Sequence, residues 1–276
     1  MYNFVILQQM VAIDRAQNRF ELRASIQTLL RIIGSCTSSE RVYIFDWDET
    51  DNVFRNSYEW CGDNVQPWID NLQSVDSADM PYWLEAFERG DSMIIDNVED
   101  VKDLMPSEYQ LLVMQDIHSE IAFPIFYKDQ LKGFIGVDNP HIESSESFIS
   151  LLGVVGGHLG NVRETLRMTE LLEQRLGSLC RAAGYDEIIT YSFISPTYYD
   201  KIRMPVDSPE RESFKILNPL GEDTSIMRTT TLPSMLEILT RNYNFRNKEV
   251  RLYELGRTYH LSLIHISEPT RPISIS

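Results

Sequence analysis

A run of glycines is the first pattern in this sequence that resembles a site for chemistry. Gly153, Gly156, Gly157 and Gly160 follow one another at spacings close to those of a loop that cradles a phosphate. The pattern departs from the dinucleotide-binding spacing G-x-G-x-x-G, and no strand stands directly before it. We therefore expect these glycines to lie on a helix, where they let a neighbouring element pack closely.

Other reactive residue types show no catalytic or metal-binding arrangement. The five histidines lack a paired spacing such as HExxH, which holds zinc on one face of a helix. The acidic residues between Asp46 and Asp51 lack the spacing and the glycine of a calcium loop, and we expect a solvated turn there. No nucleophile elbow, P-loop or kinase signature is present. The sequence thus predicts no catalytic residue and no metal site.

Charge divides the chain unevenly. Residues 1–172 hold 28 of the 41 acidic residues and 12 of the 25 Lys and Arg residues, so the whole net charge of −16 falls on this part. An acidic module is poorly suited to nucleic acid, because phosphate contacts need cations, and direct tRNA binding is not expected. Cys36, Cys61 and Cys180 form no motif and indicate reduced thiols in a cytoplasmic protein. No apolar run is long enough for a membrane span.

Alternating and helical patterns predict an antiparallel sheet with helices in residues 1–172. The helix at 14–33 is expected to place Phe20, Ala24 and Leu29 on its apolar side together with Leu30 and Ile33. The other expected helices are 98–114, interrupted at a proline, and 148–166, and the expected strands are 41–47, 53–60, 92–95, 120–127 and 131–137. Two of the strand pairs read as hairpins, so the predicted fold class is α+β.

This pattern resembles a GAF domain of bacterial signalling proteins. The resemblance spans about 14–170 and rests on RVYIFDW, YEWCGDNVQPWIDNLQ and IAFPIFYKDQLKGFIGVDNP. It implies a pocket for an unknown small molecule and a homodimer through the GAF helices. The signature for cyclic nucleotides is absent, and Cys61 is expected to be a structural thiol rather than a bilin attachment site. The residues expected to line the pocket, or else to form ordinary core, are Trp60, Trp68, Tyr82, Trp83 and Phe123.

A second module follows from about residue 173 to residue 259. We expect two helices here, one that ends near Gly184 and one that begins at Leu232. The other expected elements are a helical turn at 196–201 and strands at 188–193 and 251–255. The runs GYDEIITYSFISP, NPLGEDTSIMRTTTLPSMLEIL and RLYELGR resemble the catalytic-like domain of the bacterial phenylalanine–tRNA ligase β subunit. The resemblance implies a truncated class II aminoacyl-tRNA synthetase-like α/β fragment.

This second resemblance implies that the segment supports the ligase complex and does not itself catalyse the reaction. In the family, the α subunit activates phenylalanine, and ATP and magnesium belong to the complete ligase complex, so no cofactor is expected in this chain. Arg228, Glu254 and Arg257 could handle ATP, because cations offset phosphate charge; the family resemblance instead implies structural or subunit-interface residues. Leu232, Leu236 and Leu239 are expected to face the core or the ligase α subunit.

The sequence therefore reads as a chimera of three parts. Residues 1–172 form the GAF-like sensor, 173–259 the β-subunit fragment, and 260–276 a non-native tail with no helix or strand of its own. Residues 261–272 resemble a translated sequencing adapter. The alternative is a GAF-type ligand-binding signalling protein that has lost its output domain.

Overall fold

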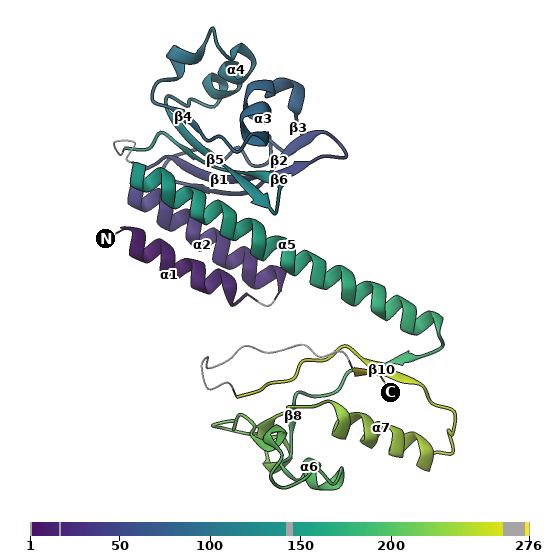
Figure 1. Ribbon diagram of the computed structural model, residues 1–276. Coiled ribbons are helices and arrows are strands. Elements are labelled where there is room, and N and C mark those ends of the chain that lie inside the picture. Colours follow the sequence, from purple (N-terminus) through teal and green to yellow (C-terminus); the bar gives the residue numbers. More distant parts are fainter. Residues whose placement is uncertain (1, 17, 142–145, 262–273, 276) are drawn as a thin grey trace. The chain divides into compact units, whose positions relative to one another are not determined.

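The computed structural model describes residues 2–16, 18–141, 146–261 and 274–275. The chain divides into two compact units, unit 1 (Met1–Met168) and unit 2 (Thr169–Ser276). The long helix α5 (Glu146–Ala182) contributes residues to both (Figure 1). No helix in the described part of the chain combines the length and the apolar character that crossing a membrane requires.

Unit 1 is built on a six-stranded antiparallel sheet. Its strand order is β3-β2-β1-β6-β5-β4. The two hairpins predicted from the sequence, β1–β2 and β5–β6, are confirmed by antiparallel ladders, each with one register shift. The strands are β1 (Arg41–Asp48), β2 (Val53–Cys61), β3 (Val75–Asp76), β4 (Met93–Ile95), β5 (Glu120–Tyr127) and β6 (Gln130–Asp138).

Helices cover both faces of this sheet (Figure 1). On one face lie α1 (Tyr2–Asp14), α2 (Arg19–Thr37) and the first part of α5. On the other face lie α3 (Pro81–Glu88), α4 (Pro106–Met114) and the 3-10 turns η1 (Ser77–Asp79) and η2 (Val98–Val101). The proline that seemed to interrupt a helix is the first residue of α4, a position at which no backbone donor is lost.

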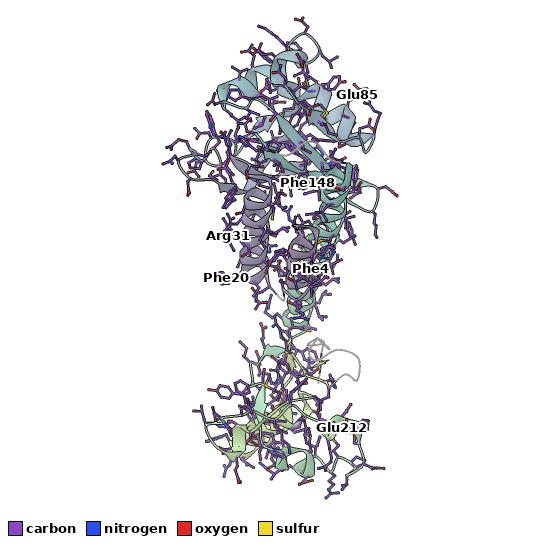
Figure 2. The ribbon with its side chains drawn as sticks, turned by 90° about the vertical axis from the view of Figure 1, so that its left-hand side faces the viewer. Phe4, Phe20, Arg31, Glu85, Phe148 and Glu212 are labelled. Carbon is purple, nitrogen blue, oxygen red and sulfur yellow. The ribbon has the colours of Figure 1, made fainter. Side chains whose placement is uncertain are left out.

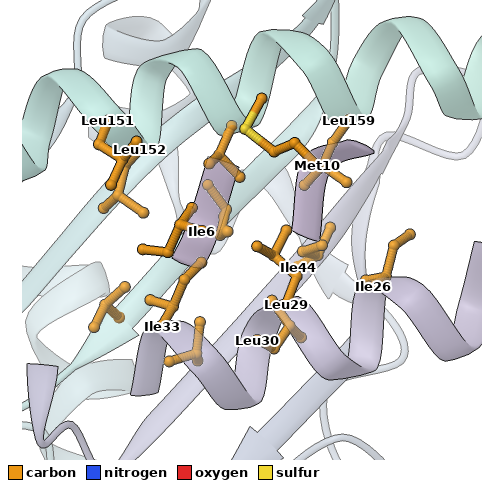
Figure 3. Packing of buried hydrophobic residues seen from close by; sticks show 14 of the residues in the cluster. Ile6, Met10, Ile26, Leu29, Leu30, Ile33, Ile44, Leu151, Leu152 and Leu159 are labelled. Carbon is orange, nitrogen blue, oxygen red and sulfur yellow. The ribbon is translucent and has the colours of Figure 1, made fainter. Parts of the chain in front are cut away.

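The sheet carries a hydrophobic core on each face because successive strand residues point to opposite sides. Val42 and Ile44 of β1 belong to the cluster under α1, α2 and α5, whereas Tyr43 and Phe45 belong to the cluster under α3 and α4. Figure 3 shows the helix-side cluster, in which Ile6 and other residues of α1 and α2 meet Leu151, Leu152 and Leu159 of α5. The predicted α+β fold, an antiparallel sheet with flanking helices, is therefore confirmed.

The N-terminal helical region differs from the prediction of one helix at 14–33. Two helices form, and Asn18 caps the second by accepting a hydrogen bond from the Glu21 amide. Phe20 and Ala24 were expected on the apolar side but are exposed, Phe20 to 82% (Figure 2). Leu22 and Ile26 are buried instead, because they share a helical face with Leu29 and Leu30.

Three of the four glycines expected to permit close packing, Gly153, Gly156 and Gly160 of α5, do so. A Cβ on Gly160 would lie 2.0 Å from the carbonyl oxygen of Phe126, and one on Gly156 would lie 3.1 Å from that of Pro124. Gly153 faces the ring of Phe123, whereas Gly157 has nothing within 4 Å. The helix can therefore approach the backbone of β5 closely.

Unit 2 consists of short strands and helices. One sheet has the order β11-β10-β7, and β8 pairs separately with β9. Its elements are β7 (Asp186–Glu187), β8 (Phe193–Ile194), α6 (Thr197–Lys201), η3 (Pro209–Arg211), η4 (Glu222–Thr224), β9 (Ile226–Met227), α7 (Leu232–Asn244), β10 (Leu252–Glu254) and β11 (Ser274–Ile275).

Two expectations for unit 2 were wrong. Of the strand expected at 188–193, only Phe193 lies in a strand, β8; Ile189 and Tyr191 are exposed, and the preceding residues of β7 pair with β10. The tail was expected to hold no strand, yet β11 pairs antiparallel with β10. Residues 262–273, which carry most of the adapter-like run, lie outside the described residues.

Candidate ligand-binding site

A cavity of about 40 Å³ lies inside unit 1, on the sheet face covered by α3 and α4. Strand residues, the connection between β2 and α3, and α4 all contribute to its wall. The lining residues are Tyr43, Phe45, Asn56, Glu59, Leu72, Val75, Met80, Trp83, Glu108, Leu111, Leu112, Gln115, Ile117, Glu120 and Phe134.

Aromatic rings form a large part of this wall. The rings of Phe45 and Phe134 stack with centroids 4.9 Å apart, and the Trp83 ring meets Phe134 edge-on at 5.5 Å. Tyr43 meets Phe45 edge-on at 5.5 Å. Such contacts hold the rings in fixed orientations, so the cavity is preformed.

A buried polar row crosses three neighbouring strands beside the cavity. Asp138 of β6 lies opposite Arg41 of β1 on one side and Glu120 of β5 on the other. Arg41 Nε donates to Asp138 Oδ2 at 2.8 Å, and the hydroxyl of Tyr43 donates to Glu120 Oε1. Arg41 also donates to the carbonyl oxygen of Gln115 at 2.8 Å.

Burial shifts the proton affinities of this row. It raises the pKa of the Glu120 carboxyl well above its usual value, and the neighbouring Asp138 carboxylate raises it further. Burial raises the pKa of Asp138 to about 6, although the guanidinium of Arg41 opposes this. Burial also raises the pKa of Tyr43. The protonated form of Glu120 is therefore favoured.

Three buried polar atoms on the cavity lining have no hydrogen-bond partner among the described residues. They are Asn56 Oδ1, Trp83 Nε1 and Glu120 Oε2. An unpaired buried polar atom costs about 1–3 kcal/mol. A molecule that pairs with these atoms would recover part of that cost, which makes the cavity a candidate binding site.

Two further carboxylates of the lining are already engaged by backbone amides. Glu108 Oε1 accepts from the amides of Tyr82 and Trp83 at 2.7 and 3.4 Å, at the start of α3. Glu59 Oε2 accepts from the amides of Trp68 and Ile69 at 2.9 and 3.0 Å. These contacts hold the start of α3 and the connection before it against the cavity wall.

The structure brings one of the five predicted pocket aromatics to this cavity. Trp83 lines it, and Trp68 packs against the same core cluster without reaching the lining. Tyr82 is partly exposed. Trp60 and Phe123 pack on the opposite sheet face, against the cluster under the helices α1, α2 and α5. Strand alternation separates them from the cavity.

The sequence interpretation missed Tyr43, Asn56 and Glu120. A signal for Glu120 was present, since a carboxyl residue stands directly before the apolar run of β5. Charged residues are rarely fully buried without a partner, so a charge on a buried strand points to a polar network.

Cys61 lies at the end of β2 and is half-buried. Burial raises the pKa of its thiol to about 11. The nucleophilic form of a cysteine is the thiolate, which this shift disfavours. The geometry thus fits the structural role expected for Cys61.

In unit 2, Arg228 and Glu254 form the centre of a buried network. Arg228 Nη2 lies 3.2 Å from Glu254 Oε1, and Arg228 Nε donates to the carbonyl oxygen of Arg257 at 2.9 Å. Glu254 Oε1 also accepts from the amide of Thr190 at 2.9 Å. The guanidinium is therefore occupied by protein groups, and the side chain of Arg257 is half-buried. On α7, Leu232 and Leu236 are exposed and Leu239 is half-buried.

Comparison with known proteins separates the same two regions. A family model described as GAF domain matches residues 22–164, and one described as phenylalanyl tRNA synthetase beta chain CLM domain matches residues 159–272. The two matches meet within α5.

Solved GAF structures share the fold of unit 1. The phycocyanobilin-bound GAF domain of a cyanobacterial phytochrome aligns with a TM-score of 0.51 and 16% identity, over 60% of this chain and 96% of that one. The phycoerythrobilin-bound GAF domain of a cyanobacterial phytochrome aligns with a TM-score of 0.50 and 16% identity, over 61% and 97%.

The relatives of the second region are β subunits of phenylalanine–tRNA ligase. That of Clostridium tetani is 49% identical over 88 residues, which are 32% of this chain and 11% of the relative. That of Clostridium acetobutylicum is 54% identical over 78 residues, 28% and 10%. The chain thus spans about a tenth of these relatives. Through residues 22–164 the chain belongs to the GAF domain family, and it continues into a segment similar to part of the phenylalanine–tRNA ligase β subunit.

Proposed function

We propose that unit 1 binds a small polar molecule in the cavity beside Glu120 and that unit 2 is a non-catalytic fragment. The observation that supports binding is that three residues with a buried, unpartnered polar atom line one aromatic cavity. A few placed polar groups within apolar walls are typical of small-ligand sites. The free thiols Cys36, Cys61 and Cys180 fit a reducing cytoplasm.

The size of the cavity limits the ligand. Pockets for drug-sized molecules measure roughly 300–1,000 Å³, far more than the 40 Å³ here. The bilins named for the similar solved structures therefore do not fit this cavity as it stands. The raised pKa of the Cys61 thiol also disfavours covalent attachment.

A thermal-shift screen of the whole chain against small metabolites tests the binding proposal. A molecule that binds only the folded state raises the melting temperature of unit 1. We expect at least one compound to do so, and Val75→Phe, which fills the cavity, to abolish the shift. Val101→Phe packs near the same core without lining the cavity and should preserve it. A screen without any hit would contradict the proposal.

The second candidate function belongs to unit 2, which would dock on the ligase α subunit. Support comes from the β-subunit relatives and from Leu232 and Leu236, two apolar side chains that α7 exposes. Size-exclusion chromatography with purified α subunit should show co-elution, weakened by Leu236→Glu. Leu104→Glu, an exposed position in unit 1, is the matched control. Elution as two separate peaks for the unaltered chain would exclude this docking.

The GAF helices also suggest a homodimer. Phe4, Leu7 and Val11 of α1 are exposed and recur at spacings of three and four, which form one apolar stripe. A second copy of the chain would cover this stripe by helix packing. Sedimentation equilibrium should give a dimer mass that Leu7→Glu reduces to that of the monomer. A monomer mass for the unaltered chain at all concentrations would contradict it.

A further inference from the structure

The charge of the cavity lining selects the class of ligand. Glu59, Glu108 and Glu120 line it, whereas no Lys, Arg or His of the described residues does. The guanidinium of Arg41, which lies beside the lining residue Gln115, is bound to Asp138 and to the carbonyl of Gln115. An anion would meet the carboxylates of Glu59 and Glu108 without a balancing cation, so phosphates and carboxylic acids are disfavoured.

The aromatic wall favours the opposite charge. The rings of Tyr43, Phe45, Trp83 and Phe134 line the same space as the carboxylates. An ammonium group is attracted by aromatic faces, most strongly where water is excluded. Carboxylates and aromatic rings together form the environment that recognises a small organic cation.

The unpartnered atoms indicate that the ligand carries two chemical groups, a hydrogen-bond donor and a hydrogen-bond acceptor. Asn56 Oδ1 is an acceptor and needs a donor, and the Glu120 carboxyl can accept at Oε2 once ionised. Trp83 Nε1 can only donate, so it needs an acceptor. A cavity needs roughly 10–15 Å³ to hold a single water, so 40 Å³ admits only a molecule of a few heavy atoms.

The geometry points to a small amino alcohol as the ligand of this cavity, an inference that rests on the binding function proposed above. Its ammonium group would donate to Asn56 Oδ1 and Glu120 Oε2, and its hydroxyl would accept from Trp83 Nε1. The aromatic rings would enclose the short carbon chain. Ethanolamine has this composition and is the probe for the test.

Calorimetric titration of the whole chain with four molecules of similar size tests the inference without any substitution. Ethanolamine carries both the ammonium group and the hydroxyl, and ethylammonium lacks the hydroxyl. Ethylene glycol has no charged group, and glycolate carries a negative charge in place of the positive one. We expect ethanolamine to bind at least tenfold more tightly than ethylammonium or ethylene glycol, and glycolate not to bind. Equal or tighter binding of ethylene glycol or glycolate would overturn the amino alcohol.

Two variants assign the contacts. Trp83→Phe keeps an aromatic ring and removes the donor, so ethanolamine should fall to the affinity of ethylammonium, which itself should not change. Glu120→Gln removes the carboxylate, so ethanolamine should weaken at least tenfold while ethylene glycol does not. An unchanged ethanolamine affinity in both folded variants would overturn the assignment.

The two levels of the proposal fail in different ways. In one case none of the four probes binds, but another compound from the metabolite screen shifts the melting temperature and Val75→Phe abolishes that shift. The cavity then binds a ligand, and the inference of an amino alcohol is wrong. If no compound shifts the melting temperature, the binding function itself falls.

Discussion

The guanidinium of Arg228 and the carboxylate of Glu254 meet at 3.2 Å in the interior of unit 2, and neither side chain is more than 3% exposed. Thr190 and the carbonyl oxygen of Arg257 complete their hydrogen bonds. This pair joins β10 to the segment before α7. Its loss should therefore affect the folding of unit 2 as a whole.

Replacing Arg228 by Met should unfold unit 2, because it leaves the carboxylate of Glu254 buried without its partner. Breaking a buried ion pair in this way costs about 3–5 kcal/mol. Amide exchange of α7 and β10 should become fast. Arg241→Met, at an exposed position of α7, is the control and should leave exchange unchanged. Slow exchange in Arg228→Met would show that the pair does not hold the unit together.

Two glycines of one helix should respond oppositely to alanine. Gly160→Ala places a Cβ 2.0 Å from the Phe126 carbonyl and should destabilise unit 1 by at least about 2 kcal/mol, because α5 must move off β5. Gly157→Ala meets open space and should stabilise by about 0.5–1 kcal/mol through helix propensity. Urea unfolding followed by tryptophan fluorescence measures both. Equal effects would mean that α5 does not pack on β5 as described.

The stability of unit 1 should depend on the protonation of Glu120. Its pKa and that of Asp138 are raised in the folded chain, to about 6 for Asp138, so folding is favoured by protons. This contribution is full below the unfolded pKa values and is lost as pH rises through the folded ones. Glu120→Gln mimics the protonated form. It should match the unaltered chain near about pH 4 and exceed its unfolding free energy near about pH 8, where the unaltered chain must bury a charge.

An exposed carboxylate provides the control of opposite sign. Amide hydrogen bonds from Asp51 and Thr50 lower the pKa of Asp48, so its contribution to stability is present above the unfolded pKa and lost as pH falls. The advantage of the unaltered chain over Asp48→Asn should therefore grow as pH rises. If both variants changed in the same direction, the pKa shifts would have been assigned wrongly.

The hairpins and the last GAF helix could be predicted because local patterns decide them. Apolar residues alternate on both sides of Lys128, which predicts the β5–β6 hairpin. Apolar residues recur at helical spacing from Phe148 to Leu166, which predicts α5. The helix α1 was missed since its exposed face is also apolar, as Phe4 and Leu7 show, and so the pattern lacks a polar side. The strand expected at 188–193 was placed wrongly because the pairing partners of this region, β10 for β7 and β9 for β8, lie far along the chain.

The site was harder to predict than the fold. Large aromatics were visible in the sequence, but which sheet face each one joins depends on register, and this placed Trp60 and Phe123 away from the cavity. The polar row depends on three strands meeting at Asp138. The pattern within any one strand does not show which residues it will face on its neighbours. The carboxyl residue before the apolar run of β5 was nevertheless a usable signal for a buried polar group.

The two units differ in how much apolar surface they bury. The described residues of unit 1 form two large buried clusters, one on each face of its sheet. The buried cluster among the described residues of unit 2 consists of Ile194, Tyr199 and Ile226. A domain with a small core is marginally stable alone, and regions with few buried contacts open most readily.

Hydrogen–deuterium exchange of the whole chain tests most directly the claim that a GAF unit and a ligase fragment fold as separate units. We predict slow exchange in β1, β5 and β6 and fast exchange in α7 and β10, with Arg228→Met changing only the second group. Equal protection in both groups, lost together in one cooperative step, would contradict the claim.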